Sequence, residues 1–145
     1  MRIALDTSCI INLLSTEETP APELLGLLRL GLDNMVRVNV TPIVDVEIPQ
    51  MDEEPGKAAR RPFIRESLDQ FPVAEVSDAR AAERDRLAAG YLNLLWPNME
   101  EGSRKHGNSY RDCQHLASQV ICGGDLFVTL DQKLARKAAA HASDI

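Results

Sequence analysis

Residues 123–131 read Gly-Gly-Asp-Leu-Phe-Val-Thr-Leu-Asp, and this stretch decides the fold class. Leu126–Leu130 is a continuous, largely apolar run, of the kind found in strands that are buried on both faces of a parallel sheet. Gly123 and Gly124 are expected to end the helix before this strand, and Asp131 is expected to start the last helix after it. The stretch therefore predicts a helix, a buried parallel strand and a second helix in succession.

The same alternation runs through the rest of the chain. Apolar runs and two-residue periods predict strands, and apolar residues at helical spacing between capping or breaking residues predict helices. Ser77 and Ser109 are expected to cap two of these helices. Strands are expected at residues 2–5, 36–40, 72–76 and 125–130, helices at residues 9–14, 22–34, 44–48, 57–70, 78–93, 109–122 and 133–142, and exposed loops at residues 49–55 and 100–108.

Strands that alternate with helices predict an α/β fold. We expect a three-layer α/β/α sandwich with a central parallel sheet of about four or five strands, formed by a single domain over residues 1–145. After the last helix the chain reaches Ile145 without an obvious further edge strand. Either the sheet is one strand shorter at this edge, or a partner completes it.

Composition narrows the function classes. The 145 residues are 44% hydrophobic, enough for one core, and carry a formal charge of −6, which argues against a general binder of polyanions. The charge does not exclude a nuclease, because acids around a metal site are neutralised locally when a cation binds. No apolar run of about 18 residues is present, so a cytoplasmic protein without membrane contact is expected. The three cysteines lack C-x-x-C spacing and are expected to be reduced core thiols.

Four carboxylates fall where the predicted fold can bring them together. Asp6 and Asp131 follow the carboxyl ends of apolar strands, where ligands gather in parallel sheets. Asp112 lies in the first turn of a helix, and Glu47 lies on a helix entered from a strand. Four uncompensated carboxylates would raise one another's pKa values, which implies a bound cation. Each acid also has an ordinary explanation as a helix cap, a partner of a helix dipole or a surface residue.

Oxygen ligands without His or Cys favour a hard cation, and Mg²⁺ or Mn²⁺ leaves coordination positions open for water and phosphate. Such a site suits hydrolysis of a phosphodiester bond. An aspartyl-phosphate phosphatase would need a second Asp where Ser8 stands, and a signalling receiver domain would need a phosphoacceptor Asp and a late Lys that are not evident. His115 and His141 are expected to be ordinary helix residues.

Three segments resemble the acidic motifs of PIN domains. Residues 3–12 read Ile-Ala-Leu-Asp-Thr-Ser-Cys-Ile-Ile-Asn and resemble the first motif, in which a strand delivers an Asp. Residues 112–117, Asp-Cys-Gln-His-Leu-Ala, and the stretch ending at Asp131 resemble the third and fourth motifs in order and spacing. Val46-Glu47-Ile48 resembles the middle motif more loosely, and Asp45 is the alternative ligand there.

The resemblance implies a Mg²⁺- or Mn²⁺-dependent endoribonuclease that cleaves RNA. Its acidic pocket would consist of Asp6, Glu47, Asp112 and Asp131, oriented by Thr129 and supported by Ser8, with Asp125 outside the pocket. PIN domains of this size include VapC-type toxins, which implies a small antitoxin partner and a homodimer. A catalytically silent PIN-like module, binding protein or RNA, is the alternative. RNA would be guided by Arg104, Lys105 and His106 on the loop before Asp112, or by the helical cluster of Lys57, Arg60, Arg61 and Arg65.

Overall fold

A computed structural model describes residues 1–14, 19–50, 72–73 and 76–145. A parallel sheet lies at its centre, built from β1 (Arg2–Leu5), β2 (Arg37–Val40) and β3 (Leu126–Val128). The strand order is β2-β1-β3, so the amino-terminal strand is the middle one. The register pairs Leu5 with Val40 on one side and with Val128 on the other. The carboxyl ends of all three strands therefore lie at one edge of the sheet.

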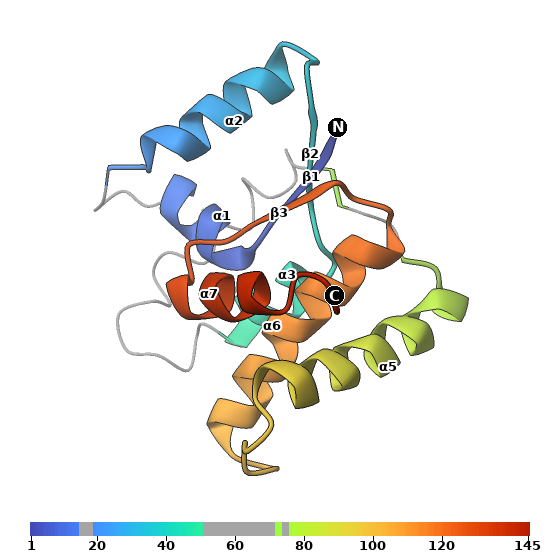
Figure 1. The fold of residues 1–145 in the computed structure, drawn as a ribbon. Helices are drawn as coiled ribbons and strands as arrows, with labels where there is room; N and C mark the ends of the chain where they lie inside the picture. Colours follow the sequence, from blue (N-terminus) through green and yellow to red (C-terminus); the bar gives the residue numbers. More distant parts are fainter. Residues whose placement is uncertain (15–18, 51–71, 74–75) are drawn as a thin grey trace.

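Six helices are described around this sheet, and Figure 1 shows their arrangement. The segments between β1 and β2 form α1 (Thr7–Leu14) and α2 (Pro22–Leu32), and α3 (Val44–Gln50) follows β2. The second half of the chain contributes α5 (Asp78–Leu95), α6 (Arg104–Ile121) and α7 (Gln132–Ala140). Within the described part of the chain, no helix is both long enough and apolar enough to cross a membrane.

Two hydrophobic clusters pack against the two faces of the sheet. The first joins Ile3 and Leu5 of β1 to apolar residues of α1, α2 and α3. The second joins α5, α6 and α7, and Phe127 of β3 packs against it. Successive side chains of a strand point to opposite faces. Ile3 and Leu5 therefore lie in the first cluster, whereas Phe127, the β3 partner of Ala4, packs against the second. The predicted α/β class with a parallel sheet is confirmed.

The sheet is smaller than the predicted four or five strands. Among the described residues it has three strands, and the expected strand at 72–76 contributes a single parallel bridge between Val40 and Val73. The prediction that β3 is buried on both faces is also wrong, because 44% of Leu126 is exposed. β3 lies at the edge of the described sheet. An apolar run in the sequence does not distinguish an edge strand from a central one.

The expected loop at residues 100–108 is wrong in its second half. Helix α6 begins at Arg104, five residues before the expected cap at Ser109. Ser103 is the N-cap residue, and its Oγ accepts a hydrogen bond from the backbone N–H of His106 at 3.1 Å. Ser77 occupies the N-cap position of α5 but makes no side-chain capping bond. The Ser103 cap therefore allows α6 to continue through Gly107 and Asn108, although these two residues have low helix propensity.

The carboxyl-terminal residues pack onto the second cluster. Residues 141–144 form turns after α7, and Ile145 packs against α5, where the Tyr91 hydroxyl donates to its main-chain oxygen at 3.2 Å. The expected helix at 57–70, with its basic cluster, and most of the loop at 49–55 lie outside the described residues.

Candidate functional site

Asp6 lies at the carboxyl end of β1, and only 5% of it is exposed. Its Oδ1 accepts a hydrogen bond from the backbone N–H of Thr7 at 2.8 Å. Its backbone N–H donates to the carbonyl oxygen of Val128 at 2.9 Å, which continues the pairing of β1 with β3. The strand pairing therefore fixes Asp6 beside the end of β3, as the sequence predicts for a strand-end acid.

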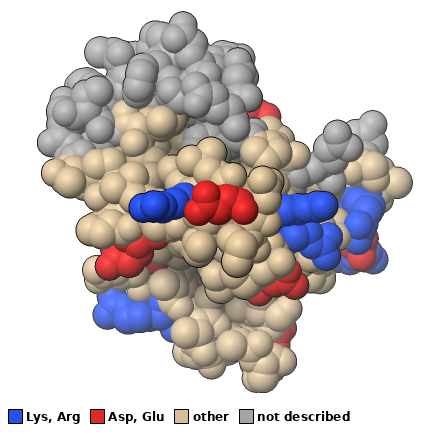
Figure 2. Space-filling model, turned by 90° about the horizontal axis from the view of Figure 1, so that it is seen from above, with Lys and Arg blue, Asp and Glu red and all other residues tan. Residues whose placement is uncertain are grey.

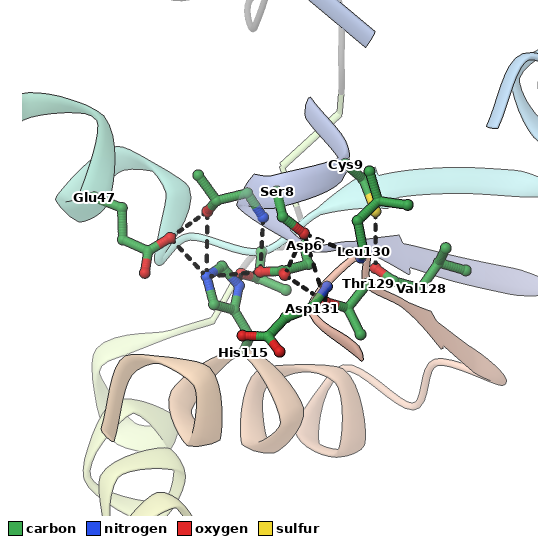
Figure 3. A network of polar contacts seen from close by, with 11 residues as sticks. Asp6, Ser8, Cys9, Glu47, His115, Val128, Thr129, Leu130 and Asp131 are labelled. Atoms are coloured by element: carbon green, nitrogen blue, oxygen red, sulfur yellow. Dashed lines mark hydrogen bonds and ion pairs between the residues drawn. The ribbon is translucent and has the colours of Figure 1, made fainter. Parts of the chain in front are cut away.

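Two hydroxyl groups hold the other carboxylate oxygen of Asp6, as Figure 3 shows. Ser8 Oγ donates to Oδ2 at 2.8 Å, and Thr129 Oγ1 donates to the same atom at 2.7 Å. Each hydroxyl also accepts a backbone N–H, from Leu130 at 3.1 Å and from Asp131 at 3.0 Å. Ser8 and Thr129 thus fix the orientation of the Asp6 carboxylate.

Glu47 reaches the same region from α3. Its Oε2 accepts a short hydrogen bond from the Thr7 hydroxyl and lies 3.0 Å from Nε2 of His115. Asp45, the alternative ligand on the same helix, is exposed. Residues two apart on a helix point in different directions, so α3 can direct only one of these acids into the pocket. The structure places Glu47 there.

His115 is the main residue of the site that the sequence prediction missed. Its side chain is fully buried, with Nε2 facing Glu47 and lying 3.6 Å from Oδ1 of Asp6. Its other ring nitrogen, Nδ1, lies 2.5 Å from the hydroxyl of Thr41, which is itself buried. The expectation that His115 is an ordinary helix residue is therefore wrong. The signal was its position three residues after Asp112, which places both side chains on one face of α6.

Asp112 lies on α6, partly buried, and its pKa is raised to about 7. Burial is the largest cause, followed by the negative charges of Asp6, Asp131 and Glu47. Close like charges disfavour ionisation, so the shift reflects three other predicted acids near this carboxyl group. The charges of the other three predicted acids therefore all act on Asp112.

Asp131 has a structural role in addition to its place at the rim of this group. It is exposed and is the N-cap of α7, where its Oδ1 accepts from the backbone N–H groups of Lys133 at 2.7 Å and Leu134 at 3.0 Å. Asp131 thus has the helix-capping role that was the alternative to metal binding expected from the sequence. The interaction with Asp112 shows that the cap lies near the pocket.

The buried pair of Glu47 and His115 shifts both pKa values. Burial alone would raise the pKa of Glu47, but the hydrogen bond with His115 and its charge lower it below the usual value. Burial alone would lower the pKa of His115, but the hydrogen bond to Glu47 and the charges of Asp6, Glu47 and Asp112 raise it. Both shifts favour an imidazolium beside a carboxylate. The pair thus binds a proton more readily than an isolated histidine would.

The donor set suits a divalent cation. One ligand atom each from Asp6, Glu47 and His115 lies within 4.8 Å of the others, and Asp112 adds a carboxyl group on the same face as His115. The pKa of Asp112 is raised in part by the negative charges of the surrounding acids, and a bound cation would neutralise these charges. Asp125 lies at the opposite end of β3, where its Oδ2 accepts from the backbone N–H of Arg2 at 2.7 Å.

The basic residues expected to guide RNA are distributed unevenly. Arg104 and Lys105 are exposed on the first turn of α6 instead of a loop, and Arg111 lies close enough to Glu47 to lower its pKa. On the face shown in Figure 2, described Lys and Arg side chains form small separate groups interspersed with acids. The sequence prediction did not single out Arg111, whose charge acts on Glu47.

A comparison of the sequence with protein-family models and with curated proteins gives no match.

Proposed function

We propose that the chain is a metal-dependent endoribonuclease of the PIN class that hydrolyses RNA phosphodiester bonds. The observation that supports this most is that Asp6, Glu47 and His115 each offer a ligand atom within 4.8 Å of the others; burial and the nearby acids also raise the pKa of Asp112. The four predicted acids come from four places in the chain: the end of β1, α3, α6 and the start of α7. A buried group of acids is costly for a fold unless it binds a cation.

In this proposal Asp6, Glu47 and Asp112 hold Mg²⁺ or Mn²⁺ through carboxylate oxygens, and Asp131 closes the rim. When bound, such a cation supplies an activated water and offsets charge on the scissile phosphate. The chain's own residues orient these ligands: Ser8 and Thr129 fix Asp6, and Thr7 fixes Glu47. Arg111, next to Asp112 in the chain, is placed to contact a phosphate oxygen of the RNA.

The test is cleavage of RNA by the purified full chain with Mg²⁺ or Mn²⁺, with and without EDTA. We expect cleavage only with the cation, and its loss in Asp112→Asn. Asp125→Asn is the matched control, because Asp125 lies at the other end of β3 and should leave cleavage unchanged. Cleavage that persists in EDTA or in folded Asp112→Asn would contradict the proposal.

A catalytically silent PIN-like module is the second candidate. The observation that favours it is that pocket groups already have partners within the protein: Asp131 caps α7, and Glu47 pairs with His115. Such a module would bind RNA or protein without cutting. Binding of RNA by the wild type without cleavage under any cation would select this alternative.

The role of a toxin with a small antitoxin partner, acting as a homodimer, is the part of the proposal that depends on the resemblance alone. Copurification of a small second chain after expression from the native locus would support the toxin role. Light scattering on the purified protein would test the dimer, which predicts twice the 16.0 kDa mass of one chain.

A further inference from the structure

We propose that His115 is itself a metal ligand, and that Nε2 of His115, Oδ1 of Asp6 and Oε2 of Glu47 form a site that prefers a divalent transition metal ion, such as Mn²⁺ or Co²⁺, over Mg²⁺. The inference rests on the proposed function, because it assigns a ligand and a metal class to the same pocket. It differs from the all-oxygen site that the sequence predicts.

The distances suit a single ion. Nε2 lies 3.0 Å from Oε2 of Glu47 and 3.6 Å from Oδ1 of Asp6, and the three ligand atoms are within 4.8 Å of one another. Metal–ligand bonds of about 2.1 Å place neighbouring ligands roughly 3.0 Å apart in an octahedral site and roughly 3.4 Å apart in a tetrahedral one. One cation can therefore contact all three atoms after small side-chain movements.

The second ring nitrogen has the partner that a ligating histidine needs. Nδ1 lies 2.5 Å from Oγ1 of Thr41, and both side chains are buried. When a cation displaces the proton on Nε2, Nδ1–H still donates to this hydroxyl, and the lone pair of Nε2 is available to the cation. Metal-bound histidines almost always donate their other N–H in this way, which fixes the tautomer and the ring orientation. Thr41 is thus a positioning residue for His115.

The donor types decide the class of metal. Mg²⁺ takes oxygen ligands and retains several waters, whereas imidazole nitrogen suits transition metals. Two carboxylates and one imidazole on one side of an ion also leave positions open for water and substrate. The competing explanation is that His115 only donates a hydrogen bond to Glu47. A glutamine at this position could still donate that bond but would offer no imidazole nitrogen.

The test is pulsed electron paramagnetic resonance of the full chain loaded with Mn²⁺, which detects a directly bound imidazole nitrogen by its ¹⁴N modulation of the spin echo. The chain has three histidines. The double variant His106→Gln/His141→Gln therefore leaves His115 as its one imidazole. We expect the modulation in the wild type and in the double variant, and its loss in His115→Gln.

Affinities give a second measurement by calorimetry. We expect Thr41→Val to weaken Mn²⁺ binding by about 10- to 100-fold, the range for lost partners of metal ligands, and His115→Gln to weaken it at least as much. Mg²⁺ affinity should change little in either variant. Equal Mn²⁺ affinity of the wild type and His115→Gln would overturn the inference.

The wild type alone can also overturn it, even if a variant fails to fold. Mn²⁺-loaded wild type without ¹⁴N modulation, or wild type that binds no Mn²⁺, excludes His115 as a ligand. RNA cleavage combined with either result leaves the nuclease proposal standing and removes this inference. If the ¹⁴N modulation is present but no cation supports RNA cleavage, the metal site is supported and the nuclease proposal is contradicted.

Discussion

Nε2 of His115 lies 3.0 Å from Oε2 of Glu47, although 68 positions separate the two residues in the chain. This contact joins α3 to α6 across the carboxyl end of the sheet, next to Asp6. It makes Glu47 the acid of α3 that belongs to the pocket and leaves Asp45 at the surface.

Glu47→Gln should therefore reduce RNA cleavage by roughly 100-fold or more, because it removes a carboxylate from the cation site. Asp45→Asn is the matched control: it removes one negative charge from the same helix, and cleavage should stay near the wild-type rate. Initial cleavage rates at saturating Mn²⁺ measure both. A larger loss in Asp45→Asn than in Glu47→Gln would show that the other acid of α3 is the functional one.

The stability of the metal-free protein should fall as pH rises, because of Asp112. Its pKa is raised from 3.8 to about 7, so between these values the folded state binds more protons than the unfolded state. The penalty is complete above the folded pKa and amounts to at most about 4 kcal/mol. Asp112→Asn removes it.

We therefore expect Asp112→Asn to unfold at higher urea concentration than the wild type at about pH 8, with a much smaller difference at about pH 5. The measurement is urea denaturation in the presence of EDTA. A difference between the two proteins that does not change with pH would show that Asp112 titrates normally.

Mn²⁺ should stabilise the wild type more at about pH 8 than at about pH 6. Binding has to displace protons from Asp112 and His115, whose pKa values are both raised, so lower pH opposes the cation at both residues. Free cation at 100 times its Kd adds about 2.7 kcal/mol to the free energy of unfolding. Thermal denaturation with and without Mn²⁺ measures this, and an equal rise in Tm at both pH values would contradict it.

Thr129→Val should lower cleavage by about 10- to 100-fold, because the hydroxyl that orients Asp6 is lost. It should also reduce the free energy of unfolding by about 2 kcal/mol, since a hydrogen bond to a charged group disappears. Thr129→Ser keeps the hydroxyl and should stay close to the wild type in both measurements. If Thr129→Ser loses as much cleavage as Thr129→Val, the hydroxyl is not the functional part of the side chain.

Ser103→Ala should reduce the free energy of unfolding by about 1 kcal/mol, because the capping bond to the N–H of His106 is lost. Ser77→Ala makes the same chemical change at the start of α5, where the serine makes no side-chain capping bond, and should have little effect. Urea denaturation of the two variants compares them directly. Equal losses of stability in the two variants would contradict the capping role of Ser103.

Local signals were enough to predict much of the fold. The run before Asp6 predicted β1, the leucines after Pro22 predicted α2, and Gly123, with a positive φ of 63°, ends α6 as expected. These features depend on residues adjacent in sequence, where periodicity and glycine's conformational freedom act directly. The number of strands depends on which runs pair across the chain, and apolar composition does not specify pairing.

The residues of the candidate site also differ in whether local sequence signals indicate them. Asp6 and Asp131 could be predicted because strand ends are recognisable in sequence, and Glu47 because a motif resemblance placed it. His115 and Thr41 were missed because their roles depend on a contact 74 positions apart in the chain. The start of α6 was missed for a different reason: its cap, Ser103, is a local signal, but Gly102, Gly107 and Asn108 around it have the composition of a loop.

The hydroxyls of Ser8 and Thr129 both accept a backbone N–H from residues 130–131 and both donate to one oxygen of Asp6. Their hydrogens therefore point inward whether or not a cation is present, and the carboxylate is preorganised by the main chain itself. The Asp6 carboxylate is therefore already oriented before a ligand binds, so binding costs little side-chain conformational entropy at this residue.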